Sequence, residues 1–275
     1  ESIVLDPGAV YNPAEDLMFP ELDISGVALT VNAELVIETS YIVILRHNTD
    51  GTVSVLSLDV HEGTVVHNLS TAAIWTEIPE NFKAYSCIYR TLANTFVVFY
   101  SPNFNEVIFY NFSDTLQTTT LAFKPKKMVS HVNRLFAIDT SFVLWWSGAG
   151  NQTNWYSDEL PENYVLEDAG VWPIHTESIL SDIAVLNNAL YVFAPNDIYI
   201  FRGYSYDNFS LEKILSNFGI SPTLDYRRIA ISKGTIYFVY RDAIYEFNGE
   251  SYPVIISRPA MTAGQVTNGI AGGIP

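Results

Sequence analysis

One apolar segment occurs twice in this chain, and this repeat limits the possible folds more than any other feature. Residues 190–203 and residues 236–249 both alternate aromatic or β-branched residues with polar ones around a short turn, which predicts a β-hairpin in each copy. The copies keep a single offset of 46 residues, as shown by the pairs Tyr191 and Tyr237, Tyr199 and Tyr245, Phe201 and Phe247, and Gly203 and Gly249.

A third copy lies upstream, because Phe136 and Gly148 have the same spacing of 12 residues as Tyr191 and Gly203. A hairpin that recurs every 45 to 55 residues is typical of a β-propeller, in which each sheet buries its faces against the next. We therefore predict an all-β fold, a propeller with four-stranded blades. The sequence pattern predicts five blades, and a sixth could form if the N-terminal strands pair with later sequence. The predicted number of blades is therefore five or six.

The propeller is expected over residues 27–257, with an extended N-terminal arm at 1–26 and a C-terminal linker at 258–275 that leads towards a missing segment. One helical turn is expected between Ser70 and Thr76. The predicted strands are 28–31, 34–38, 41–45, 53–59, 64–67, 85–89, 95–100, 106–112, 118–123, 128–131, 135–138, 142–146, 183–186, 190–194, 198–203, 211–215, 228–232, 235–240, 243–248 and 252–256.

The net charge of −16 argues against a nucleic-acid interface, which normally carries a basic patch. Two basic runs occur, Lys124-Pro125-Lys126-Lys127 and Arg227-Arg228, and we interpret both as solvated turns. The longest apolar runs, such as Tyr41 to Leu45, are too short to cross a bilayer, so no membrane insertion is expected.

No catalytic or metal-binding pattern is present in the sequence. The five histidines are dispersed, although His61 and His67 lie near one predicted hairpin and could face each other. Cys87, the single cysteine, is expected to be a buried strand residue. Acidic residues that a glycosidase would need are plentiful but do not recur on the innermost strands. We therefore predict no enzyme, no cofactor and no metal site.

An aromatic loop is the best candidate for binding. Trp145, Trp146, Trp155 and Tyr156 lie within twelve residues, and Trp and Tyr are favoured at protein interfaces. Because alternate strand residues point to opposite faces, Trp145 or Trp146 is expected in the blade core. The candidate partner-contact residues are Trp155, Tyr156 and Tyr164. The segment 147–155 also faintly resembles a sialidase Asp-box that lacks its Asp.

The second half of the chain resembles a known family. Asn133–Ala137, Trp145–Gly150 and Trp155–Pro161, followed by 183–193, 197–203, 219–222, 234–238 and 243–249, are similar to a pattern in the tail nozzle proteins of short-tailed bacteriophages, also called tail tubular or tail stabilisation proteins. The resemblance covers residues 128–257. The first half of the chain shares only the regular succession of short predicted strands. Proteins of this family are usually larger.

The resemblance implies a structural virion protein in the phage tail. It would form a ring of six copies below the portal and adaptor and would contact other tail or head–tail connector proteins. The ring would surround the DNA exit channel, where negative charge lets DNA pass without sticking. Two alternatives remain open: a propeller module that binds a glycan or receptor through the aromatic loop, and a glycoside hydrolase.

Overall fold

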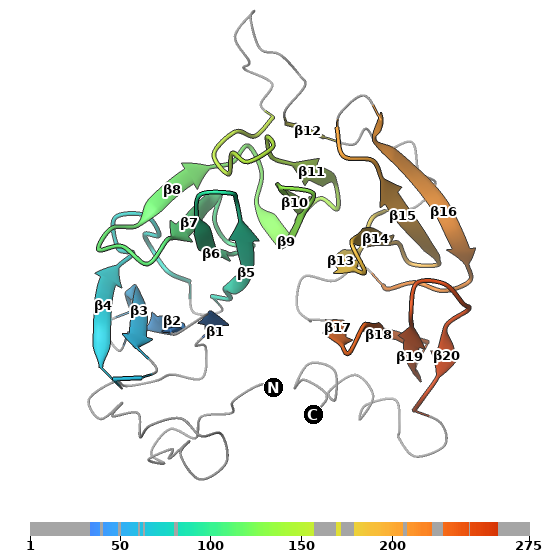
Figure 1. Cartoon of the computed structure of the whole chain (residues 1–275), viewed down its shortest axis with the longest axis horizontal. Helices are drawn as coiled ribbons and strands as arrows, with labels where there is room; N and C mark the ends of the chain where they lie inside the picture. Colours follow the sequence, from blue (N-terminus) through green and yellow to red (C-terminus); the bar gives the residue numbers. More distant parts are fainter. Residues whose placement is uncertain are drawn as a thin grey trace, which may run out of the picture. The chain divides into compact units, whose positions relative to one another are not determined.

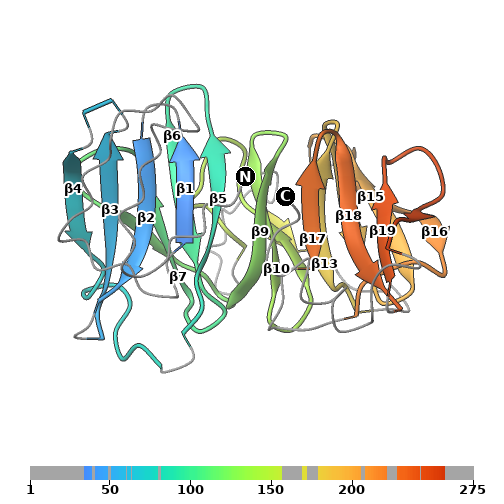
Figure 2. The ribbon, with the colours of Figure 1, turned by 90° about the horizontal axis from the view of Figure 1, so that it is seen from below.

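The computed structural model describes residues 34–38, 41–48, 51–59, 61–62, 64–79, 82–156, 169–171, 179–205, 208–221, 228–241 and 243–257. The expected N-terminal arm, the expected strand at 28–31, and the expected linker at 258–275 lie outside these residues. The described part consists of five antiparallel four-stranded sheets and contains no helix (Figures 1 and 2). It accordingly holds no helix of the length and apolarity needed to cross a membrane.

The chain divides into two compact units, residues 3–124 and a second unit that contains residues 125–275. The first unit holds two sheets, with the strands β1 (Glu34–Glu38), β2 (Tyr41–His47), β3 (Val53–Asp59), β4 (Val65–Ser70), and then β5 (Tyr85–Arg90), β6 (Thr95–Tyr100), β7 (Glu106–Tyr110) and β8 (Gln117–Thr120). Within this unit, β2 and β3 pack against β6 and β7 through a core that includes Val43, Val55, Val97, Phe99 and Tyr110.

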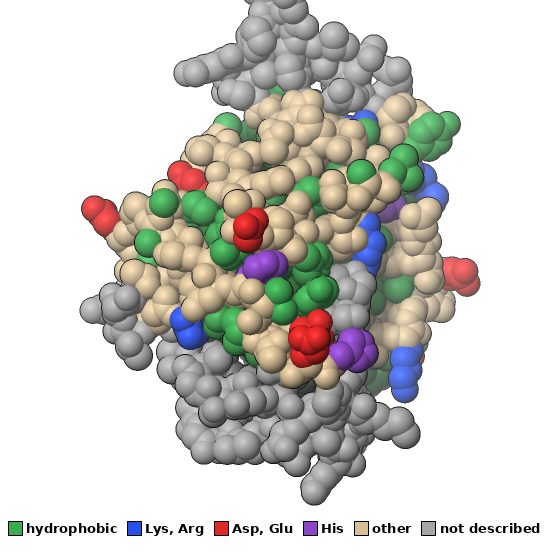
Figure 3. Space-filling view, turned by 60° about the vertical axis from the view of Figure 1, so that its left-hand side comes forward, with side chains coloured by type: hydrophobic (Ala, Val, Ile, Leu, Met, Phe, Trp, Pro, Cys, Tyr) green, Lys and Arg blue, Asp and Glu red, His purple; other side chains and the backbone are tan. Residues whose placement is uncertain are grey.

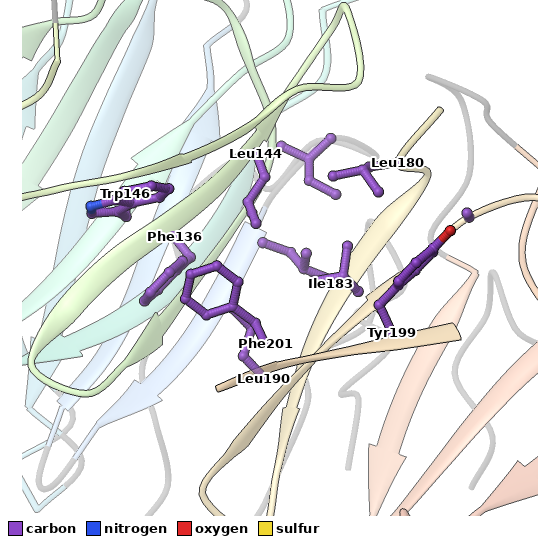
Figure 4. Close-up of a cluster of buried hydrophobic side chains, with 11 residues drawn as sticks. Phe136, Leu144, Trp146, Leu180, Ile183, Leu190, Tyr199 and Phe201 are labelled. Atoms are coloured by element: carbon purple, nitrogen blue, oxygen red, sulfur yellow. The ribbon is translucent and has the colours of Figure 1, made fainter. Parts of the chain in front are cut away.

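The second unit holds three sheets. Their strands are β9 (Pro125–His131), β10 (Arg134–Asp139), β11 (Leu144–Trp146), β12 (Gly170–Val171); β13 (Asp182–Leu186), β14 (Ala189–Phe193), β15 (Asp197–Arg202), β16 (Ser210–Ser216); and β17 (Ile229–Ser232), β18 (Thr235–Tyr240), β19 (Ala243–Phe247), β20 (Val254–Ile255). The middle sheet packs against a neighbouring sheet on each face, mainly through β13, β14 and β15. One face packs against the β9–β12 sheet around Phe136, Trp146 and Phe201 (Figure 4), and the other packs against β18 and β19.

Each sheet is a meander in which neighbouring strands follow one another in sequence. In the second unit, the first strand of the middle sheet, β13, lies beside β9 on one side and beside β17 on the other. Successive sheets therefore meet along their first strands, as blades do around a propeller axis. The predicted all-β fold with four-stranded blades is confirmed, and the described residues supply five of them.

The 46-residue repeat is confirmed in its register. Tyr191 pairs with Ile200, and Tyr237 pairs with Glu246, so both hairpins are closed in the same way. Gly203 and Gly249 both have left-handed backbones, with φ of 106° and 90°. The third copy departs from this pattern. Phe136 pairs with Trp146, ten residues on instead of nine, because the β10–β11 turn has one more residue, so Gly148 is not the counterpart of Gly203.

Strand ends differ from the sequence-based expectation where the backbone turns. Phe142, expected in a strand, has a φ of 66° in the turn before β11, which therefore begins at Leu144. The strand expected at 64–67 is β4, Val65–Ser70, and the last strand shortens to Val254–Ile255 after Pro253. The expected helical turn is a single turn, in which Trp75 N donates to Thr71 O (2.9 Å).

The last strand, β20, ends its sheet. Ile256 N donates to Ile244 O (3.0 Å), and Val254 pairs with Glu246, so residues 254 and 256 turn their backbone groups towards β19. Because alternate residues of an antiparallel strand bond to opposite sides, the backbone groups of Pro253 and Ile255 point away from β19. Pro253 has no N–H to offer at that edge.

Candidate partner-contact site

The aromatic loop starts at the end of β11 and lies within the third sheet, before its last strand β12. Ser147 to Tyr156 fold into a compact turn in which Gly148 N donates to Asn154 O (2.8 Å) and Gly150 N donates to Asn133 O (2.7 Å). Gly150 has a φ of 66°, a backbone conformation that residues other than Gly and Asn rarely adopt. The loop is thus held to the β9–β10 hairpin by backbone hydrogen bonds.

Asn151 fixes the tip of this loop. Its side-chain oxygen accepts hydrogen bonds from the backbone N of Thr153 (3.1 Å) and from the Thr153 hydroxyl (2.8 Å). This is the local bonding by which Asn and Asp side chains stabilise turns. The segment that faintly resembles an Asp-box therefore forms a turn that is stabilised by hydrogen bonds to the amide oxygen of Asn151.

Trp155, one of the candidate partner-contact residues, supports the loop from inside. Only 7% of Trp155 is exposed, and its Nε1 donates to Gln152 O (2.8 Å). The sequence could not show this, because the indole is buried by the turn that precedes it and not by strand alternation. Whether the loop contacts a partner stays a prediction.

Trp145 and Trp146 point to opposite faces of β11, as alternation predicts. Trp146 is 2% exposed and packs in the core beside Phe136 and Phe201 (Figure 4). Trp145 is half-buried, and its Nε1 donates to Asp139 Oδ2 (3.0 Å). The expectation that at least one of the two lies in the blade core is confirmed.

Tyr156 is the candidate contact residue that remains accessible in part. It is half-buried, and its ring lies 6.3 Å from that of Trp145, centroid to centroid. Trp145 and Tyr156 therefore form an aromatic pair at the base of the loop. Tyr164, the third candidate, lies outside the described residues.

Exposed apolar side chains occur at a site that the sequence analysis did not single out. Around β20, Tyr252 is 72% exposed, Val254 55%, Ile255 39% and Ile256 44%. We call these four residues the β20 rim. The outer strand of another sheet, β8, carries only Gln and Thr over residues 117–120. Four exposed apolar residues between positions 252 and 256 are more than the single ones that are normal on a protein surface.

Two acidic residues of the described part, Asp139 and Asp59, close turns through their side chains. Asp139 Oδ1 accepts hydrogen bonds from the backbone N of Ser141 (2.9 Å) and of Val143 (2.8 Å), which closes the β10–β11 turn. Asp59 similarly accepts from the backbone N of His61 and Glu62. The described residues contain no group of three or more His, Cys, Asp or Glu placed to hold a metal ion.

The histidines and the cysteine also differ from the simplest expectations. His67 does not face His61, which lies in the exposed β3–β4 turn; instead, His67 Nδ1 lies 2.6 Å from the Tyr110 hydroxyl. Burial raises the pKa of Tyr110. Cys87 on β5 is half-buried, so it is less enclosed than predicted.

Charged side chains are scattered singly on the face drawn in Figure 3. Ion pairs that join neighbouring strands include Arg202 Nε with Glu212 Oε2 (3.2 Å) and Lys213 Nζ with Asp197 Oδ2 (3.2 Å). Both side chains of the Arg202–Glu212 pair are exposed, and exposed pairs of this kind contribute little stability.

Comparison with known proteins supports the fold and goes no further. No protein-family model matches the sequence, and no curated protein sequence matches it. Among solved structures, the chain is similar to virginiamycin B lyase from Staphylococcus aureus (TM-score 0.53, 11% identity, 82% of this chain and 69% of that chain). It is also similar to the WD40 domain of SCAP from fission yeast (TM-score 0.51, 10% identity, 87% of this chain and 61% of that chain). At these identities the likeness shows the β-propeller fold alone.

Proposed function

We propose that this protein is a structural subunit of a bacteriophage tail, which assembles with copies of itself into a ring around the DNA exit channel and acts without catalysis. The resemblance of residues 128–257 to tail nozzle proteins suggests this role. The structural observation that carries it is the β20 rim, an exposed apolar surface on the outer strand of a blade.

The β20 rim suits a contact between folded proteins. Tyr252 is mostly exposed, yet its ring lies 6.3 Å from that of Phe218, centroid to centroid, so the ring has support on one side. Val254 and Ile256 are exposed on one face of the strand and Ile255 on the other, so the apolar area of the rim extends around the edge of the sheet. Burial of such side chains contributes about 1.5–3 kcal/mol each when it is complete. A partner that covers the rim would gain that free energy without a large change in the blade.

Native mass spectrometry and negative-stain microscopy of the full-length protein test the proposal, with the double variant Val254→Lys/Ile256→Lys beside the wild type. Wild-type protein is expected to form rings of about six copies that dock at one vertex of tail-deficient capsids. The variant is expected to stay monomeric with an unchanged circular dichroism spectrum, because two charges cannot be buried in an apolar contact.

Thr118→Lys/Thr120→Lys on the outer strand β8 is the matched control. Both threonines are exposed, and the control adds the same charge to another outer strand. Rings that form equally well with both double variants would show that the β20 rim is not the contact. A wild-type chain that remains monomeric and indifferent to capsids would overturn the tail role.

A propeller module that binds a glycan or receptor is the second candidate, and the Trp145–Tyr156 pair favours it. A partly exposed aromatic ring that rests on a second ring is a suitable platform for a sugar or an apolar side chain. Tyr156→Ala tests this candidate, because Trp155→Ala would remove a buried support of the loop. Glycan-array binding by the wild type, lost in Tyr156→Ala while ring assembly persists, would favour the binding module.

A further inference from the structure

The turn between β19 and β20 is closed by one asparagine side chain. Asn248 follows the last residue of β19 and is exposed. Its Oδ1 accepts three hydrogen bonds, from the backbone N of Glu250 (3.0 Å), the backbone N of Ser251 (3.0 Å) and the Ser251 hydroxyl (3.1 Å). Three donors on one amide oxygen draw electron density from the amide carbon, Cγ, which makes Cγ more susceptible to attack by a nucleophile.

Gly249 follows Asn248, and the fold requires a glycine at this position. Its φ is 90°, a conformation that residues with a side chain rarely adopt, and a Cβ there would collide with the hydroxyl of Tyr191. Within the described part of the chain, no backbone hydrogen bond uses the N of Gly249. Because glycine has no side chain to hinder the approach, this nitrogen can reach Cγ of Asn248 and close a five-membered ring.

The equivalent turn of the other repeat copy is closed in a different way. Gly203 is the counterpart of Gly249 at the offset of 46 residues, but an arginine precedes it. Asn208 closes that turn by accepting hydrogen bonds from two backbone N–H groups, and it is also exposed, but Phe209 follows it. Among the described residues, only Asn248 is an asparagine followed by glycine.

We infer that Asn248 is a site of spontaneous modification, at which its side-chain amide is converted to aspartate or isoaspartate through a succinimide. The backbone N of Gly249 loses its proton to the solvent and forms a bond to Cγ of Asn248. The bond between Cγ and Nδ2 then breaks, and Nδ2 takes up a proton and leaves as ammonia. Water adds to either carbonyl carbon of the ring, which opens to aspartate or isoaspartate. No step is an oxidation or a reduction.

The hydrogen bonds to Oδ1 favour this reaction, because Oδ1 carries the negative charge of the tetrahedral intermediate. Donors that already point to the place where such charge develops stabilise it without reorganisation. Two of the three donors are backbone N–H groups of the turn, and the third is the hydroxyl of Ser251, an exposed residue. The contribution of this hydroxyl can therefore be measured by substitution.

The modification acts on the segment that carries the β20 rim. Isoaspartate lengthens the main chain of the turn by one carbon atom, whereas aspartate leaves its length unchanged. β20 is joined to β19 at two paired positions, Val254 with Glu246 and Ile255 with Tyr245. A longer turn is expected to loosen this short pairing. The reaction itself does not depend on the proposed assembly role.

Peptide mapping by mass spectrometry tests the site, after the full-length protein has been incubated at mildly alkaline pH in isotopically labelled water. Cleavage after glutamate, including Glu250, separates Asn248 from Asn208 and from Asn268, which is followed by glycine outside the described residues. Fragment spectra assign the label to single residues, and enzymatic methylation detects isoaspartate. We expect the label to enter Asn248 at least about tenfold faster than Asn208, because the ring of Phe209 hinders closure of the succinimide.

Ser251→Ala tests the role of the hydroxyl, and Ser251→Thr is the matched control that retains it. In the folded protein, Ser251→Ala should slow the reaction of Asn248 by about threefold to tenfold, because one hydrogen bond to Oδ1 is lost. In urea the two proteins should react equally, since the turn no longer aligns its donors. Ser251→Thr should react as the wild type does.

Two results would overturn the inference. If Asn248 keeps its amide, or changes no faster than Asn208, it is not a site of modification. If the folded Ser251→Ala variant reacts faster than the wild type, the hydrogen bonds to Oδ1 protect the amide instead of activating it.

Discussion

At the scale of single residues, Gly170 in β12 lies so close to the indole of Trp146 that no side chain fits between them. A Cβ at this position would lie 2.8 Å from Cε2 of Trp146 and closer still to Cζ2. Trp146 cannot retreat easily, because it is buried against Phe136 and Phe201. We predict that Gly170→Ala lowers the free energy of unfolding by about 1–3 kcal/mol through overpacking.

Urea denaturation followed by circular dichroism measures this loss. Trp146→Phe provides the second arm of a double-mutant cycle, because the smaller ring makes room for the methyl group. The two changes together should cost less than the sum of the single changes. Strict additivity would contradict a direct contact between the Cβ and the indole.

His131 on β9 gives a pH dependence whose sign follows from its burial. The side chain is 6% exposed, and burial lowers its pKa because the charged imidazolium is poorly solvated there. The unfolded chain therefore binds the proton more readily than the folded chain. The stability that comes from a neutral His131 is present above about pH 6.5 and is lost as the pH falls through the lowered value.

We predict that His131→Gln reduces the loss of stability between neutral pH and pH 5, whereas His61→Gln, in the exposed β3–β4 turn, does not. Urea denaturation at a series of pH values measures the effect, and imidazole NMR titration assigns it. A titration of His131 at or above the ordinary value would show that the prediction is wrong.

Residue-level inference from the sequence succeeded where strand alternation decides the outcome. The alternation of Trp145 and Trp146 placed one of them in the core because a strand has only two faces. It failed for Trp155, whose burial depends on a hydrogen bond to Gln152 O within an irregular turn. Nor could it show that β13 lies beside both β9 and β17, because no local pattern reports which first strands are neighbours.

At the scale of elements, three hairpins of the second unit share one turn geometry. The two central residues have left-handed φ angles in each: Val132 and Asn133 (42° and 59°), Asn187 and Asn188 (49° and 59°), and Lys233 and Gly234 (48° and 75°). Such paired positive φ angles define the type I′ turn, which favours Asn and Gly and disfavours β-branched residues. Val132 is therefore strained.

Opposite substitutions at two of these turns test this reading. Asn188→Val, at an exposed position, should destabilise the protein by about 1–2 kcal/mol, because a branched side chain opposes the left-handed backbone. Val132→Asn should stabilise it by up to about 1 kcal/mol, reduced by the packing that Val132 makes with the core. Thermal denaturation measures both, and effects of the same sign would contradict the argument.

Strands were predicted correctly where their residue pattern is clear and were missed where they are too short to have one. β3, β6 and β18 have the predicted bounds because β-branched and aromatic residues fill them. The two residues of β12, Gly170 and Val171, were missed, since a strand this short has no periodicity to detect. The shared register of the 46-residue repeat was predictable because hairpin length fixes it.

At the scale of the whole molecule, the net charge of −16 opposes the approach of identical copies. The β20 rim is apolar, so its attraction does not depend on ion pairs. We therefore predict that self-association strengthens as ionic strength rises from low to physiological, because salt screens the repulsion and leaves the apolar contact intact. Sedimentation velocity over a salt series measures this dependence, and dissociation of the rings by moderate salt would show that ion pairs hold them.

The position of Pro253 has a consequence for how far any such association can proceed. With one backbone donor missing beside Ile255, the free edge of β20 is a poor template for a continuous hydrogen-bonded ladder. Copies could therefore associate through the side chains of the rim without pairing their strand edges. Such a contact adds no further copies once each rim is buried. The same proline that shortens the last strand would thus protect a crowded population of these molecules from growing into fibrils.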